Sequence, residues 1–160
     1  MADERAVRQA KVTYDTLCRM LDEINWRYER DEENFTIDSG SSGEDLPIQF
    51  RIIVDPERMI VSLISPLPFD IPDEKRVEMA IAVSMVNYSI VDGSFDYDYT
   101  DGTLLFRMTS SFRESLIGKD VFKYMIAVSC KTIDDYNDKF LMIVKDVMSL
   151  VDLFKFIEEE

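Results

Sequence analysis

Apolar side chains near the start of the chain recur at alternating steps of three and four, the spacing of one helical face. This spacing predicts an amphipathic helix over about residues 3–25, with its apolar face turned toward a core. It could also begin a coiled coil, but it does not extend far enough along the chain to favour one. The apolar positions are Val7, Ala10, Tyr14, Leu17, Leu21 and Ile24.

Shorter alternating patterns follow this helix. Trp26 and Tyr28 alternate with charged neighbours, and Phe35 and Ile37 do the same, so this segment predicts one or two short strands. Residues 39–43 consist only of serine and glycine, a composition typical of a flexible loop. We therefore expect a flexible connection between these strands and the next one.

Two β-hairpins are predicted farther along the chain. Apolar residues alternate over 48–54, a second strand-like run covers 59–65, and a proline-containing turn at 55–58 joins them. The second hairpin is predicted over 93–109, because aromatic and acidic side chains alternate before the strong turn signal Asp101-Gly102. The residues after this turn form the returning strand.

Two helical regions complete the pattern. The first is predicted over 72–91 and is almost entirely apolar from 77 to 86, which indicates a central core helix buried on more than one side. The second runs from about 118 to 158, and its length predicts a bend or break near 131–134. Strand runs separated by single helices predict an α+β fold, a mainly antiparallel sheet with flanking helices. The 160 residues fit a single domain, 1–160.

The net charge of −14 narrows the classes of partner. Nucleic-acid phosphates and anionic membrane surfaces would repel this chain, because proteins bind both mainly through Lys and Arg. The acidic surface either keeps the protein soluble or attracts a basic partner, and the first interpretation is favoured. We expect no nucleic-acid or membrane binding. Since no apolar run resembles a signal peptide or a membrane span, we also expect a cytoplasmic protein.

No catalytic, cofactor-binding or metal-binding residues are predicted. The chain has no histidine, the commonest general base and metal ligand, and no glycine-rich phosphate-binding motif. Cys18 and Cys130 are too few for a structural zinc site, and we expect both to be reduced, buried thiols. A calcium-binding EF-hand loop starting at Asp96 would need glycine at the position of Asp101 and glutamate at the position of Arg107, so the motif does not match. An alternative left open is an enzyme that uses a carboxylate pair without a recognisable motif.

Two groups of residues are candidates for contacts with other molecules. The C-terminal segment carries more apolar side chains than one packed helical face needs, which indicates either an interface with a subunit or partner, or deep burial. The candidate interaction residues are Val147, Leu150, Val151, Phe154 and Ile157. Arg107, Arg113 and Lys119 form a basic group in an acidic chain. They indicate either ion pairs with nearby carboxylates or a contact for an anionic ligand.

A family resemblance is carried by five short segments, Leu46–Arg51, Ser65–Phe69, Asp92–Tyr97, Asp101–Gly102 and Phe106–Met108. Together they resemble YbjN-type proteins, described as proposed regulators of bacterial sensory transduction, over roughly residues 26–140. The resemblance implies a fold like that of type III secretion chaperones, with the element order α-β-β-β-α-β-β-α. Those chaperones are small, acidic and usually dimeric, and they bind extended segments of secreted clients. The resemblance transfers no catalytic residue and no cofactor.

The sequence as a whole predicts a non-enzymatic binding protein, a regulator or chaperone-like adaptor that contacts a protein partner and forms a homodimer. The first alternative is a sensor that binds a small anionic ligand near Arg107, Arg113 and Lys119. The second alternative is the carboxylate-based enzyme.

Overall fold

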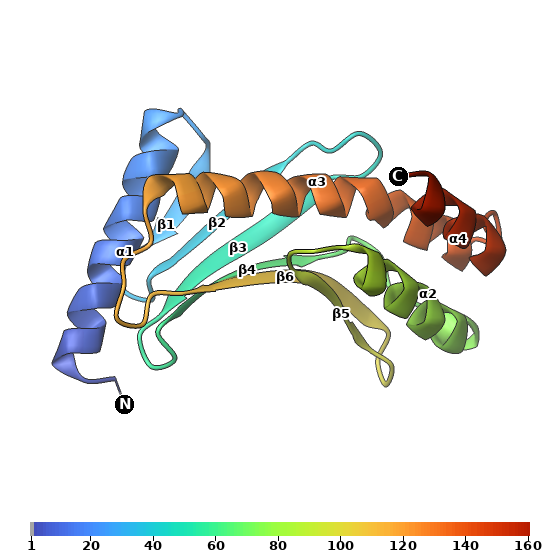
Figure 1. Cartoon of the computed structure of the whole chain (residues 1–160), viewed down its shortest axis with the longest axis horizontal. Helices are drawn as coiled ribbons and strands as arrows, with labels where there is room; N and C mark the ends of the chain where they lie inside the picture. Colours follow the sequence, from blue (N-terminus) through green and yellow to red (C-terminus); the bar gives the residue numbers. More distant parts are fainter. Residues whose placement is uncertain (1) are drawn as a thin grey trace.

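The computed structural model describes residues 2–160 as one sheet with flanking helices (Figure 1). The elements are α1 (Glu4–Glu23), β1 (Tyr28–Asp31), β2 (Thr36–Ser41), β3 (Ile48–Asp55), β4 (Ile60–Pro66), η1 (Asp73–Lys75), α2 (Arg76–Ser89), β5 (Ser94–Asp98), β6 (Thr103–Ser111), α3 (Lys119–Val144) and α4 (Leu150–Glu159). The strands follow the order β1-β2-β3-β4-β6-β5, and every neighbouring pair is antiparallel. The predicted fold class and both predicted hairpins are confirmed, but the structure has one more strand before α2 and one more helix at the end than the expected order α-β-β-β-α-β-β-α.

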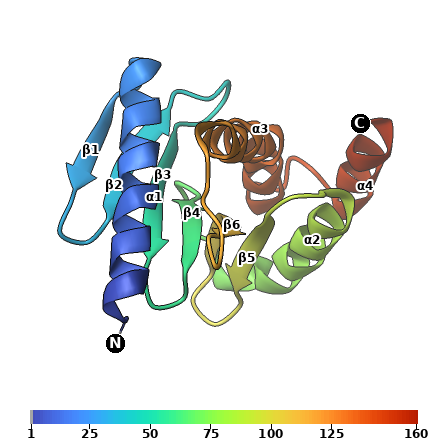
Figure 2. The same cartoon turned by 60° about the vertical axis from the view of Figure 1, so that its left-hand side comes forward.

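One face of the sheet carries the core. Along β3, Ile48, Phe50 and Ile52 are buried, while Gln49 and Arg51 between them are exposed, as the two-residue period of a strand requires. The helices α1 and α3 lie over this buried face, and α2 and α4 lie beyond the β5 end of the sheet (Figures 1 and 2). The core therefore forms between the sheet and two long helices that cross it.

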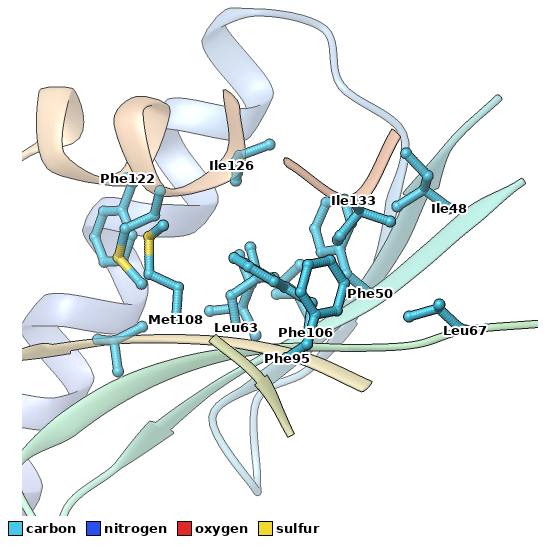
Figure 3. Close-up of a cluster of buried hydrophobic side chains, with 14 of the residues drawn as sticks. Ile48, Phe50, Leu63, Leu67, Phe95, Phe106, Met108, Phe122, Ile126 and Ile133 are labelled. Atoms are coloured by element: carbon cyan, nitrogen blue, oxygen red, sulfur yellow. The ribbon is translucent and has the colours of Figure 1, made fainter. Parts of the chain in front are cut away.

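Aromatic rings join the second hairpin to α3. The ring of Phe95 on β5 meets Phe106 on β6 at 5.2 Å and Phe140 on α3 at 5.0 Å, both edge to face. Figure 3 shows side chains from the strands meeting Phe122 and Ile126 of α3. These contacts place α3 across the centre of the buried face.

The predicted amphipathic helix at the N-terminus is confirmed as α1. It begins at a side-chain cap, because Asp3 Oδ1 accepts a hydrogen bond from the Ala6 backbone N–H at 2.7 Å. Its inner face buries Ala10, Leu17 and Leu21, and the Tyr14 hydroxyl donates to the Thr36 carbonyl on β2 at 3.0 Å. The three–four spacing in the sequence therefore marks the face that packs on the sheet.

The flexible loop predicted over residues 39–43 is wrong for its first three residues. Ser39, Gly40 and Ser41 belong to β2 and pair with β3, with Gly40 opposite Gln49. A Cβ atom at Gly40 would lie 2.5 Å from the Ile48 carbonyl oxygen, so glycine is needed there for close backbone approach. Gly40 therefore belongs to a closely paired strand and not to a flexible loop.

The central core helix predicted at 72–91 is also wrong in its role. The α2 helix buries Met79, Ala82, Val83 and Val86 on one face only, while apolar residues on its other side are exposed. It lies at the end of the molecule beside β5, and α3 is the central helix (Figure 2). The apolar composition of α2 therefore reflects one buried face and one exposed apolar face.

The break predicted near residues 131–134 lies elsewhere. The helix α3 continues through this stretch, where Lys131 pairs with Asp135 at 2.5 Å and Ile133 is buried. It ends at Val144, and Asp146 then takes a left-handed backbone conformation with φ 57°. The chain turns here, and Ser149 then caps the start of a new helix, α4, which begins at Leu150.

Candidate interaction surfaces

The outer side of α2 carries an uncharged, partly apolar stripe. Val77, Ile81 and Tyr88 are exposed at spacings of four and seven, which put them on one helical face. Tyr88 is 95% exposed. From Met79 to Val91 no residue carries a charge, although 31% of the chain is charged. Exposed apolar side chains grouped in this way are typical of a surface that contacts another molecule.

The helix α4 packs beside α2 and adds apolar side chains at the same end of the molecule (Figure 1). Of the five residues predicted from the sequence, Val147, Val151 and Phe154 are exposed, the first two at 65% and 63%. Leu150 and Ile157 are instead partly buried against the core. We call the exposed set the α2–α4 surface, comprising Val77, Ile81, Tyr88, Val147, Val151 and Phe154.

Side-chain contacts fix the start of α4. Ser149 and Asp152 form a capping box, in which Asp152 N–H donates to Ser149 Oγ at 3.1 Å and Ser149 N–H donates to Asp152 Oδ2 at 3.0 Å. Lys75, whose side chain is largely buried, pairs with Asp146 in the α3–α4 turn and with Glu78 on α2. These two acceptors raise the pKa of Lys75, so the ammonium stays charged and ties the turn to α2.

The β5 edge of the sheet is closed by a side chain of α2. Asn87 Oδ1 accepts from the Phe95 backbone N–H at 2.8 Å, and Asn87 Nδ2 donates to the Phe95 carbonyl at 2.9 Å. The amide therefore takes the place of a neighbouring strand at this position. At the opposite edge, β1 has four residues, and Glu29, Arg30 and Asp31 on it are exposed. Short, charged or covered edges resist unwanted strand addition.

The side of the sheet that points away from the core carries apolar residues between two ion pairs. Ile64 on β4 lies between Arg51 on β3 and Arg107 on β6 in the strand register. Arg51 pairs with Asp38 at 2.7 Å, and Arg107 pairs with Asp96 at 3.1 Å. The hydrogen bonds from Arg51 hold the pKa of Asp38 below its ordinary value. Each of the two arginines on this face is therefore paired with a carboxylate.

The three basic residues singled out in the sequence have separate partners. Besides the Arg107 pair with Asp96, the Arg113 guanidinium donates to the Arg58 carbonyl at 3.3 Å. Lys119, at the start of α3, pairs with Glu23 at the end of α1 at 2.5 Å. Each residue thus takes part in a local contact of its own.

The titratable groups of residues 2–160 include two free cysteine thiols. Among residues 2–160, no group of three or more His, Cys, Asp or Glu is placed to hold a metal ion. Burial, followed by the nearby charge of Asp134, raises the pKa of the Cys130 thiol to about 11, so this thiol stays protonated at neutral pH. Cys18 is a free, buried thiol, whereas Cys130, also free, is only partly buried, so the expectation of two buried thiols is wrong for Cys130. Within the same residues, no helix is both long enough and apolar enough to cross a membrane.

A surface hollow beside β1 and β2 was not predicted from the sequence. It has a volume of about 680 Å³, and Tyr28, Asp38, Gly40 and Gln49 are among its lining residues. Polar backbone and side-chain groups make up much of this lining, and the hollow is shallow and open to solvent. Its only signal in the sequence is the serine- and glycine-rich run interpreted above as a loop.

Solved structures with the same fold include E. coli YbjN and chains of two protein complexes. The crystal structure of E. coli YbjN, described as "a putative transcription regulator", aligns with a TM-score of 0.55 and 12% identity, over 83% of this chain and 89% of that one. A chain of the HopA1–SchA chaperone–effector complex gives 0.56 and 14%, over 80% and 95%. A chain of the ExsC–ExsE complex gives 0.53 and 11%, over 80% and 94%. The fold is that of the type III secretion chaperones.

Sequence comparison supplies the family. No curated protein sequence matches the chain. The family model YbjN, described as "Putative bacterial sensory transduction regulator", matches residues 13–142, from the first half of α1 to the end of α3. This match covers most of the 160 residues. The chain therefore belongs to the YbjN family.

Proposed function

We propose that this protein is a non-enzymatic binding protein, a regulator or chaperone-like adaptor that acts through protein–protein contacts and works as a homodimer. The α2–α4 surface is the contact region. The observation that carries the proposal is the exposed, uncharged stripe of α2 beside exposed Val147, Val151 and Phe154. Burial of such side chains is favourable, because apolar area is removed from water.

The charge of the chain adds to this argument. Two copies with a net charge of −14 repel each other, and so does any acidic partner. A contact across residues 79–91 brings no charged side chain of α2 into the interface, so no charge there has to lose its water. The stripe is therefore the part of α2 where close contact with another molecule involves the fewest charged side chains.

The comparisons support a protein partner in general terms. The family is described as regulatory, and one structure with the same fold is a chaperone–effector complex. The type III chaperone fold supports binding of a polypeptide as the activity, although a fold by itself does not determine a function.

Affinity capture of the tagged full chain from the cells that produce it, followed by mass spectrometry, tests the proposal. The variants Val77→Glu and Val151→Glu place a charge in the α2–α4 surface, and Val12→Glu, at an exposed position of α1, is the matched control. We expect a recurrent partner with the parent and the control and its loss with the two surface variants. Equal recovery with all three variants would contradict the choice of surface.

Light scattering tests the homodimer in the same set of proteins. Phe154→Glu should shift the mass toward that of one chain while the circular dichroism spectrum stays unchanged, because Phe154 is exposed in a single chain. A parent that has the mass of a single chain at every concentration would refute the dimer.

A further inference from the structure

The helix α4 lies outside the matched family region. That region ends at residue 142, and α4 starts at Leu150 after the turn that contains Asp146. The helix buries Leu153 completely and packs Leu150, Phe156 and Ile157 partly against the core. These four positions follow i, i+3, i+6 and i+7, which is one face of an amphipathic helix. The helix α4 is therefore an appended segment that packs against the part of the chain matched by the family.

Residues inside the family region form the surface on which α4 packs. Tyr136 on α3 lies between the two neighbouring helices, because its hydroxyl is 3.4 Å from Ser89 Oγ at the end of α2 and its ring meets Phe156 of α4 at 5.9 Å. The Lys139 ammonium lies 4.7 Å from the centre of the Phe156 ring. Together, α2 and the second half of α3 form a groove that holds one helix.

A basic residue at the rim of the groove pairs with an acidic residue of the appended segment. Lys75 holds Asp146 in the turn before α4. Near the other end of the groove, Lys131 pairs instead with Asp135 on its own helix, at 2.5 Å. The groove thus combines an apolar floor with a cationic contact at the turn that leads into α4.

We propose that α4 is a built-in competitor for this groove, whose external ligand is an amphipathic helix of a partner protein. The partner helix would carry apolar side chains at i, i+3, i+6 and i+7 and an acidic residue just before its first turn, as Asp146 precedes α4. This inference rests on the proposed protein partner, but it uses the inner face of α4 and not the α2–α4 surface. Because α4 is tethered, its effective concentration is high, and a partner must bind more tightly than a free copy of α4.

A labelled peptide with the sequence of residues 148–160 serves as the probe, and all proteins are full-length chains. Leu153→Asp removes the buried anchor of α4 and should release it, whereas Lys155→Asp, at an exposed position of the same helix outside the α2–α4 surface, is the matched control. By fluorescence anisotropy, the peptide should bind the Leu153→Asp chain at least about tenfold more tightly than the parent or the control. A peptide that itself carries the Leu153→Asp change should not bind.

Hydrogen exchange separates release of α4 from loss of the fold. In the Leu153→Asp chain, the amides of α4 should lose their protection while those of β3 and β4 keep it. A milder variant, Phe156→Ala, should speed exchange in α4 alone. Loss of protection throughout the sheet in Leu153→Asp would overturn the proposal, because α4 would then be an integral part of the fold. Equal peptide affinity for the released and parent chains, or no binding to either, would also overturn it.

The two proposals fail in different ways. A peptide that does not bind removes the groove as a ligand site, while capture of a partner at the α2–α4 surface is unaffected. Failure to capture any partner removes the proposed function, while peptide binding to the released chain would still show that α4 occupies a helix-binding groove.

Discussion

Asn87→Ala tests how the sheet ends at β5. In the parent, the Asn87 amide makes both hydrogen bonds that a neighbouring strand would make with Phe95, at 2.8 and 2.9 Å. Alanine removes both partners, and the Phe95 backbone groups remain partly buried beneath α2. Each lost hydrogen bond costs about 1–2 kcal/mol in such a position. The higher helix propensity of alanine offsets about 0.6 kcal/mol of this loss in the free energy of unfolding.

The free energy of unfolding should therefore fall by about 1.5–3.5 kcal/mol. Urea unfolding followed by the fluorescence of Trp26 measures this loss at a distant point, since Trp26 bonds to Ser39 on β2. With a denaturant dependence of about 2 kcal/mol per molar urea, the midpoint should fall by about 1 M. Ser84→Ala, at an exposed position of the same helix, is the control and should change stability by less than about 0.5 kcal/mol. Equal midpoints for the two variants would refute the closure of the edge by Asn87.

Three further predictions follow from burial and charge. Val83→Asp should lower the free energy of unfolding by about 3–5 kcal/mol, because it places a charge on the buried face of α2. Val77→Asp, on the exposed face, should melt within a few degrees of the parent. Similar melting of the two variants would show that the faces of α2 are wrongly assigned. Asp38→Asn should be less stable than the parent at pH 7, because the folded-state pKa of Asp38 lies below its ordinary 3.8. This gap in urea midpoints should close as the pH falls below about 3.8, where the parent carboxylate is protonated and loses Arg51; a gap that does not change with pH would contradict the pairing. At pH 8, labelling of Cys130 by a thiol reagent, read by peptide mapping, should be of order a hundredfold slower in the folded than in the unfolded chain, and equal rates would contradict its raised pKa.

Periodicity in the sequence was sufficient wherever an element has one buried and one solvated face. Leu17 and Leu21 on α1, and Ile52 on β3, lie where the pattern places them. It failed at Gly40, since composition does not show which backbone segment a residue will pair with. It also failed for α2, because Val77 and Ile81 look like core residues in the sequence whether a second layer covers them or not.

The candidate interaction residues illustrate the same limit. Val151 and Ile157 look equivalent in the sequence, but the rotation of α4 about its buried anchor Leu153 exposes the first and partly buries the second. That rotation is set by contacts with α2 and α3, which are distant along the chain. Tyr88 was missed because it lies in a segment assigned to the core. The absence of charge up to Val91 could have indicated an exposed contact surface.

The strand order has a consequence for how the chain folds during synthesis. The strands β1 to β4 follow one another and can pair as they emerge, but β4 finds its second neighbour only in β6, where Ile60 pairs with Ser111. At typical rates of translation, about 50 further residues take roughly 3–10 s to appear. In the finished sheet β4 lies between β3 and β6. During this interval, however, β4 is an open edge strand with an uncovered apolar face. Chains that stop before Ser111 should therefore be the species most prone to aggregation or most dependent on chaperones.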